Sequence, residues 1–197
     1  MARLHVTTPI TDEQVRQIRA GDEVLITGYI YTARDAAHKR MLEDLAVGRP
    51  LPFDPRGAVI YYVGPTPPKP GQVIGSAGPT TSYRMDKYTP DLLQQGVKLV
   101  IGKGYRSDPV KRALVEYGAA YLVSTGGAGA LLARTVEESE VIAYEDLGTE
   151  AIRRLKVKDF PTICINDAFG GDQYFAGQSQ WVKPDAMVKP KPPIASE

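Results

Sequence analysis

Apolar residues along this 197-residue chain change repeatedly between the spacing of two that strands require and the spacing of about 3.6 that helices require. Residues 23–31 (EVLITGYIY) alternate and are rich in β-branched side chains, whereas residues 34–47 (RDAAHKRMLEDLAV) place apolar side chains on one helical face. Strands separated by helices predict an α/β domain with a mixed, partly parallel sheet. The loops at the strand ends of such a sheet are available for a site.

The other elements follow from the same periodicity. Residues 64–71 (GPTPPKPG) are too rich in proline for a central strand and predict a loop. We expect strands at residues 58–63, 97–101, 120–123, 141–144 and 162–165, and helices at residues 108–117, 130–136 and 149–155.

The end of the chain differs from the rest in composition. Residues 182–197 (VKPDAMVKPKPPIASE) combine four prolines and three lysines with few large apolar side chains, so they cannot build a core. We therefore expect one folded domain at residues 1–181, followed by a tail at residues 182–197 that is either free or a strap over another surface.

Charge and hydropathy exclude several classes of function. The formal net charge is +1, which gives no whole-chain attraction for nucleic acid or an anionic membrane. No apolar run approaches the roughly 18 residues of a membrane helix. The first residues, MARLHVTTPITDEQ, lack the pattern of a secretory signal, which predicts a cytoplasmic protein.

Cysteine and histidine are too few for most metal chemistry. Cys164 is the only cysteine, so this chain alone cannot form an internal disulfide, a thiolate zinc site or an iron–sulfur cluster. His5 and His38 are 33 residues apart and leave histidine-rich metal sites short of ligands. We expect no metal bound by this chain alone, and structural roles for His5 and Cys164.

Four polar loops follow or flank predicted strands. Each has an ordinary structural explanation: a solvated helix start, a hydroxyl-capped turn, a surface lysine, or close packing of a helix. Together they supply arginine, lysine, hydroxyl and backbone N–H donors, which is the chemistry that clamps a small anion with one or two carboxylates. The loops are residues 31–40 (YTARDAAHKR), 75–86 (GSAGPTTSYRMD), 102–104 (GKG) and 124–129 (STGGAG).

Five strings in this order resemble the β-type domain of iron–sulfur hydro-lyases, the family of class I fumarase and L-tartrate dehydratase. The resemblance extends over roughly residues 4 to 175, and the YTARDAAHKR and TTSYRMDKYTP versions look more like fumarases. The strings are TGYIYTARDAAHKR, GSAGPTTSYRMDKYTP, VKLVIGKG, STGGAGALLA and YEDLGTEAIRRLKVKDFPTICINDAFG.

The resemblance implies a layered β/β/α swivelling-type domain acting as the β subunit of a two-subunit enzyme. It implies a [4Fe-4S] cluster carried by the partner α subunit and reversible dehydration of (S)-malate to fumarate. By motif, Thr80, Arg84 and Lys103 would be catalytic and Arg34, Thr81 and Gly102 would bind substrate. Thr80 is an awkward base, because a threonine hydroxyl accepts a proton only if nearby cations stabilise its alkoxide.

Five further residues would support this site. We expect Asp35 and Asp86 to orient the neighbouring guanidinium groups, with simple surface carboxylates as the alternative. His38 either donates into the site or supports a salt-bridge network, and Gly126 and Gly127 shape the loop beside it.

Other functions remain open. The same scaffold suits L-tartrate or a methylated fumarate, as in a mesaconase-like enzyme, and pocket size would decide among them. A non-catalytic anion-binding module would have no need of Arg34, Thr80, Arg84 and Lys103 together. A phosphate-binding protein would use the STGGAG junction instead.

Overall fold

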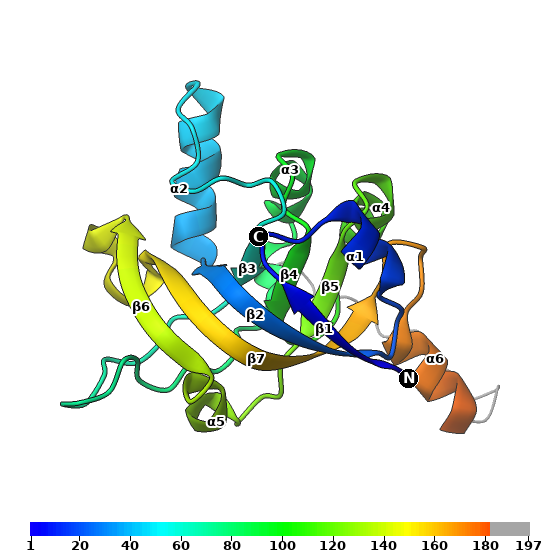
Figure 1. Cartoon of the computed structure of the whole chain (residues 1–197). Helices are drawn as coiled ribbons and strands as arrows, with labels where there is room; N and C mark the ends of the chain where they lie inside the picture. The colour runs from blue at the N-terminus through cyan, green and yellow to red at the C-terminus, as the bar shows by residue number, and fades with distance from the viewer. Residues whose placement is uncertain (182–197) are drawn as a thin grey trace.

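The computed structural model describes residues 1–181, so the predicted tail at residues 182–197 lies outside the described residues (Figure 1). The strands are β1 (Arg3–Thr7), β2 (Glu23–Thr32), β3 (Val59–Tyr61), β4 (Leu99–Gly102), β5 (Ala120–Val123), β6 (Val136–Ala143) and β7 (Ile152–Asn166). The helices are α1 (Asp12–Gln17), α2 (Asp35–Ala46), α3 (Thr89–Gln94), α4 (Asp108–Glu116), α5 (Gly129–Ala133) and α6 (Gln173–Trp181), with 3-10 turns η1 (Ser82–Met85) and η2 (Glu145–Glu150).

The sheet closes on itself. Its strand order is β1-β2-β3-β4-β5-β7-β6, and an additional pairing between β2 and β7 joins β2, β3, β4, β5 and β7 into a five-stranded barrel. β1 extends the barrel alongside β2, and β6 extends it alongside β7. β2 to β5 run parallel, while β7 is antiparallel to both of its barrel neighbours. The predicted α/β class with a mixed, partly parallel sheet is confirmed, and the closure was not predicted.

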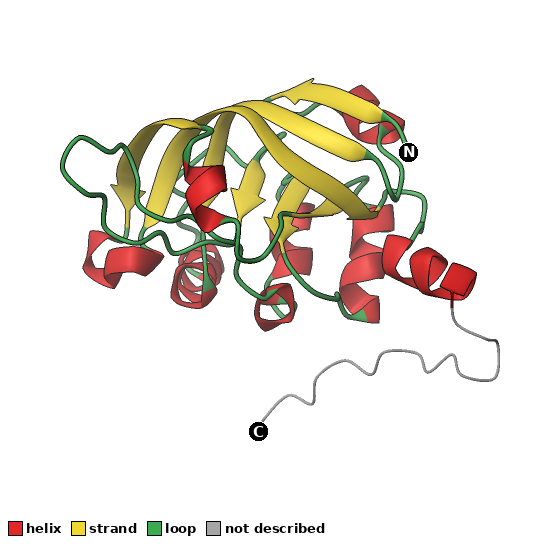
Figure 2. Cartoon of the chain, turned by 90° about the horizontal axis from the view of Figure 1, so that it is seen from below, coloured by secondary structure: helices red, strands yellow, loops and turns green. Residues whose placement is uncertain are grey.

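Alternate side chains of the barrel strands belong to two apolar cores. Val59 and Tyr61 of β3 belong to the cluster that fills the barrel, whereas Ile60 packs with apolar residues of α2, α3 and α4 outside it. Figures 1 and 2 place these three helices on the same side of the strands. Burial on both faces explains why the parallel strands read as continuous apolar runs in the sequence.

The last third of the chain departs from the prediction. Residues 149–155 were expected to be helical, but Ile152 begins β7, a single 15-residue strand that also contains the predicted strand at 162–165. Pairing with β2, β5 and β6 outweighs the helix-favouring residues of this segment. The predicted helix at 130–136 is shorter, because β6 already begins at Val136.

Within residues 1–181, no helix combines the length and the apolar character needed to cross a bilayer.

Candidate active site

The carboxyl ends of four parallel strands lie at one edge of the barrel. Because β2, β3, β4 and β5 point the same way, the chain leaves each of them at this edge. Three of the four predicted polar loops begin at these strand ends, and the fourth, residues 75–86, is joined to the ends of β3 and β4 by backbone hydrogen bonds, so the fold gathers all four. We call this edge the carboxyl edge.

Two guanidinium groups meet there on one carboxylate. Arg84 Nε donates to Asp35 Oδ1 at 2.9 Å, and a second hydrogen bond joins Arg84 Nη2 to Asp35 Oδ2. Arg34, the residue before α2, places its Nε 3.9 Å from the same carboxylate. Burial alone would raise the pKa of Asp35, but the hydrogen bond from Arg84 and the two positive charges hold it below its usual value. Asp35 therefore orients Arg84 as well as its neighbour Arg34.

The Arg34 side chain is held on its other sides by two residues from distant segments. Its Nη2 lies 3.3 Å from Glu150 Oε1, and Glu150 also accepts the Ala36 N–H at 2.9 Å. A Cβ atom on Gly64 would lie 2.8 Å from Arg34 Nη1, so any larger residue there would force this guanidinium to shift. The Arg34 Nε is buried without a hydrogen-bond partner. Sequence reasoning missed Gly64 and Glu150, and the glycine that ends an apolar run was the available signal for the first.

Backbone hydrogen bonds attach the threonine loop to β3 and β4. Thr80 N–H donates to Tyr62 O at 2.7 Å, and Lys103 N–H donates to Thr80 O at 3.2 Å. Thr81 pairs with Lys103 as an isolated parallel bridge. Thr80, Thr81 and Lys103 are thus brought together, with the Lys103 side chain exposed and in no ion pair with another residue of the described chain.

The predicted glycines have different surroundings. Gly102 is buried, and a Cβ there would collide with Ser82 Oγ, so its evident role is close packing. Gly126 is exposed, and a Cβ on it would lie 3.8 Å from Lys103 Cδ. Gly127 is also exposed and has a φ of 81°, which favours glycine.

The STGGAG junction is explained by packing. Gly129 is buried, and a Cβ there would lie 2.8 Å from Gly78 N. Its carbonyl accepts the Ala77 N–H at 3.1 Å, which holds the 76–78 segment against the start of α5. The phosphate-binding alternative gains no support from this geometry.

His38 lies beneath Arg34 and does not face an open site. Its ring is fully buried, with Nδ1 2.8 Å from the Arg34 carbonyl oxygen. A carbonyl only accepts, so Nδ1 carries the proton and Nε2 is left without a partner. Burial lowers the pKa of His38 to about 4. Donation into the site is therefore excluded for this neutral ring, and support of the Arg34 backbone is the role its position allows.

Asp86 corrects another expectation. It was predicted to orient Arg84, but its Oδ1 accepts from Arg106 Nε at 2.8 Å and its Oδ2 accepts from Ser107 N–H at 2.7 Å. The Arg106 side chain has no exposed surface. Sequence reasoning missed Arg106 because an arginine in a turn is usually solvated, and no sequence signal marks it as buried.

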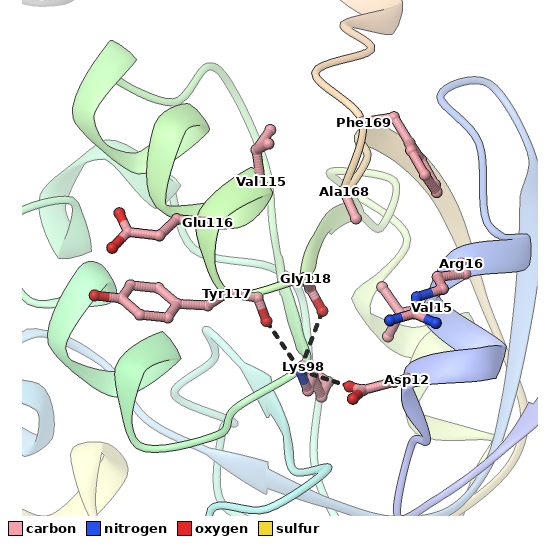
Figure 3. A pocket seen from close by; sticks show the side chains of 10 residues that line it. All are labelled: Asp12, Val15, Arg16, Lys98, Val115, Glu116, Tyr117, Gly118, Ala168 and Phe169. Atoms are coloured by element: carbon pink, nitrogen blue, oxygen red, sulfur yellow. Dashed lines mark hydrogen bonds and ion pairs between the residues drawn. The ribbon is translucent and has the colours of Figure 1, made fainter.

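None of the predicted site residues lines either of two cavities found among residues 1–181. The first, of about 320 Å³, lies between α1, the α4–β5 turn and residues 168–169 (Figure 3). Lys98 and Gly118 precede β4 and β5, so this cavity is at the opposite, amino edge of the barrel. The second, of about 310 Å³, is lined by Pro65, Ile74, Thr149 and Arg153 among others, and flanks the contact between Gly64 and Arg34.

The donor set does not suit an iron–sulfur cluster. Among residues 1–181, no three His, Cys, Asp or Glu side chains gather where they could hold a metal ion. Cys164 is fully buried in the barrel core, and burial raises the pKa of its thiol, which opposes the thiolate that iron needs. His5 is exposed on β1, where its Nδ1 lies 3.4 Å from Asp159 Oδ1.

Comparison with known proteins gives consistent matches. The family model described as "Fumarase C-terminus" matches residues 1–177. The chain is 40% identical over 162 residues to "Fumarate hydratase class I, anaerobic" of Escherichia coli K12, covering 81% of this chain and 29% of that protein. It is 38% identical over 175 residues to "Fumarate hydratase 1, mitochondrial" of Leishmania major, covering 87% and 32%.

A shorter relative is matched along most of its length. The chain is 36% identical over 172 residues to "L(+)-tartrate dehydratase subunit beta" of Escherichia coli K12, covering 85% of this chain and 84% of that subunit. The chain therefore spans about a third of the length of the fumarate hydratases it matches, and most of the tartrate dehydratase subunit.

Proposed function

The chain belongs to the family of the class I fumarate hydratase C-terminal domain and the L-tartrate dehydratase β subunit, a hydro-lyase family, and from this membership we propose that it is the β subunit of a two-subunit class I fumarase. The proposed reaction is the reversible dehydration of (S)-malate to fumarate. The two-subunit form is favoured because the match covers 84% of a β subunit but 29% of a longer fumarate hydratase.

The observation that carries this proposal is that Arg34 and Arg84 share the Asp35 carboxylate at the carboxyl edge. A guanidinium has five N–H donors in a fixed fork, so a carboxylate bound at two of them leaves others for a substrate. Two such groups held side by side, with the exposed Lys103 on the same edge, suit a diacid better than a monoacid.

The same cations would serve the proton-transfer step. As C3 of malate loses its proton, negative charge builds on the adjacent carboxylate, and fixed guanidinium groups stabilise that charge without reorganising. In this proposal the Thr80 side chain acts as an alkoxide that Arg84 and Lys103 stabilise: it takes the C3 proton, becomes a hydroxyl, and then gives that proton to the hydroxide that leaves C2, which departs as water. Thr80 lies four residues before Arg84, and its carbonyl accepts the Lys103 N–H, so both cations come from adjoining backbone.

The cluster and the partner belong to the same proposal. The family uses a [4Fe-4S] cluster, and a chain with one buried thiol does not provide its ligands, so the α subunit would carry it. The finer description of the fold as a layered β/β/α swivelling-type domain, and the division into a catalytic domain at 1–181 and a tail at 182–197, are also part of this proposal.

Reconstitution tests the proposal. The purified chain is expected to be colourless and inactive, and mixing with a cluster-bearing α subunit without oxygen should give malate dehydration. Arg84→Ala should lower kcat/KM at least about 100-fold, because a charge-stabilising donor is lost. Arg56→Ala is the matched control, since Arg56 also binds one aspartate (Asp54) through two hydrogen bonds, but precedes β3 rather than following it. Turnover by the chain alone, or equal losses in both variants, would contradict the assignment.

A second candidate is the β subunit of an L-tartrate dehydratase, favoured by the 84% coverage of that subunit. Comparing kcat/KM for malate, L-tartrate and mesaconate in the reconstituted enzyme decides between these substrates. Dicarboxylate binding without turnover of any of them would instead indicate an anion-binding module.

A further inference from the structure

A buried polar cluster lies under the carboxyl edge, between the segment that carries Arg84 and the segment that carries Lys103. Its members are at most 4% exposed, so none of them can touch a substrate bound at the surface. Tyr62 directly follows β3, Ser82 begins η1, Thr89 begins α3, Arg106 follows the Lys103 segment, and Tyr121 is in β5.

Arg106 is the charged centre of this cluster. Its Nη2 donates to Thr89 Oγ1 at 2.6 Å and its Nη1 donates to Tyr62 Oη at 3.2 Å, besides the ion pair with Asp86. The guanidinium carbon lies 4.9 Å from the centre of the Tyr121 ring. Burial opposes its charge, but Tyr62, Asp86 and Tyr121 raise the pKa of Arg106. Arg106 therefore holds the ring of Tyr121 from beneath.

The Tyr121 hydroxyl belongs to a chain of hydrogen bonds whose directions are fixed by the groups at its ends. Lys103 N–H can only donate, and it is shared between Thr80 O and Ser82 Oγ, with the Ser82 oxygen at 3.0 Å. The Gly104 carbonyl can only accept, and it accepts from Tyr121 Oη at 2.8 Å. Ser82 must then donate to Tyr121 across the 2.9 Å between their oxygens.

This chain ties the two segments together through side chains. Ser82 begins η1, which carries Arg84, and Lys103 and Gly104 directly follow β4. Hydrogen bonds in series polarise and strengthen one another in a buried setting. This series of hydrogen bonds therefore opposes movement of the two segments relative to each other. The phenol is not itself an acid or base for the reaction, because burial raises its pKa and both of its hydrogen bonds are internal.

We propose that Tyr121, backed by Arg106, is a positioning residue that fixes the distance between Arg84 and Lys103. Its effect on catalysis rests on the proposed function. A displacement of about 1 Å between a substrate and the groups that clamp it can cost about 100-fold in rate, so one buried hydroxyl can control activity without touching the substrate.

The first test uses the chain reconstituted with its cluster-bearing partner. Tyr121→Phe keeps the ring above Arg106 and removes the hydroxyl, and we expect kcat/KM for the dicarboxylate to fall roughly tenfold or more. Tyr144→Phe is the matched control: it also removes one hydroxyl, which donates to Asp44 Oδ2 at 2.7 Å, and should leave kcat/KM within about twofold. Tyr121→Phe loses two hydrogen bonds, to Ser82 and Gly104, and Tyr144→Phe loses one, so a purely structural role would lower the stability of both variants without a tenfold loss of kcat/KM in the folded Tyr121→Phe enzyme.

A double-mutant cycle isolates the chain of hydrogen bonds. Ser82→Ala should lower kcat/KM as much as Tyr121→Phe does. The kcat/KM of the double variant should lie within about twofold of the more impaired single variant, because both substitutions remove the same series of hydrogen bonds. Losses that multiply in the double variant, or a Tyr121→Phe enzyme with wild-type kcat/KM, overturn the proposal.

Amide hydrogen exchange in the chain alone keeps this inference separate from the proposed function. Tyr121→Phe should speed exchange in peptides from residues 80–86 and 102–107 by roughly fivefold, and leave peptides from α2 unchanged. If the wild-type reconstituted protein dehydrates no substrate, the proposed function fails while the exchange result still decides whether Tyr121 joins the two segments. Unchanged exchange overturns the proposal whatever the activity.

Discussion

The two edges of the barrel both present lysines and acidic side chains, yet they use them differently. At the amino edge, the Lys98 ammonium donates to Tyr117 O at 2.9 Å and Gly118 O at 3.3 Å, and pairs with Asp12 at 2.7 Å (Figure 3). An ammonium has three donors, and all three are used. At the carboxyl edge, Lys103 forms no ion pair within residues 1–181, and one carboxylate is shared between two guanidinium groups.

We take unused donors, rather than empty volume, as the guide to the site. The amino edge holds the cavity of about 320 Å³, but its lysine closes the turn between α4 and β5 and has nothing left for a ligand. At the carboxyl edge, Lys103 is exposed on a segment held by backbone pairing, and the Arg84 side chain is 38% exposed. We therefore assign structure to the first edge and chemistry to the second.

Replacing each lysine by methionine is the strongest test of the roles assigned to the two edges. Lys103→Met should lower kcat/KM of the reconstituted enzyme by roughly 100-fold or more, because a charge near the developing carboxylate charge is lost. Its free energy of unfolding should change by less than about 0.5 kcal/mol, since the side chain is exposed. Steady-state kinetics and urea unfolding of the same preparations measure both quantities.

Lys98→Met should show the reverse. It leaves the carbonyls of Tyr117 and Gly118 without their donor, which should cost about 1–3 kcal/mol of unfolding free energy while kcat/KM stays within about twofold. If Lys98→Met lost activity and kept stability, the assignment of the two edges would be reversed.

Lowering the pH should destabilise the carboxyl edge before the amino edge. His38 has its pKa lowered from 6.5 to about 4 by burial, so between these values the unfolded chain binds a proton that the folded chain does not. Stability therefore falls as pH decreases from about 6.5 to about 4, by roughly 3 kcal/mol in total. In this window, hydrogen exchange should increase at the start of α2 before it increases in α1.

His38→Asn is the control for that pH dependence. It removes the titrating ring, so the slope of unfolding free energy against pH between about 6.5 and about 4 should become shallower than in the wild-type chain. An unchanged slope would show that another group causes the acid sensitivity.

The sequence predicted the elements of the carboxyl edge better than those of the last third of the chain. β5 was predicted with its observed bounds, and β2 to within one residue, because each is a strong apolar pattern followed by polar or turn residues. β7 was predicted as part helix, because its strand character comes from pairing with β2, β5 and β6, which lie far away in sequence. The closure of the barrel depends on the same long-range pairing and left no local pattern.

Within the candidate site, the sequence located the loops but not the partners of their side chains. Arg34 and Arg84 were predicted to act together, and the structure brings them to one carboxylate. The sequence could not predict that Asp86 would pair with Arg106, because that contact joins residues 20 positions apart and depends on the tertiary fold. The full burial of His38 was also not predictable, because a histidine in a charged first turn of a helix is usually solvated.

The smallest expected effect tests how tightly Arg34 must be held. A methyl group from Gly64→Ala would press on Arg34 Nη1 at 2.8 Å and on Thr149 O at 3.1 Å, and the flexible guanidinium should yield before the backbone does. Because a displaced guanidinium binds a carboxylate less well, KM for malate should rise roughly fivefold with kcat little changed, the pattern of a lost uniform-binding contact. Gly177→Ala is the control, since a Cβ there has no atom within 4 Å and the residue is in α6, where alanine is favoured over glycine. A rise in KM for both variants, or for neither, would contradict the claim that Gly64 helps to hold the Arg34 guanidinium in place. The carboxyl edge would then need no more precise positioning of its side chains than the amino edge.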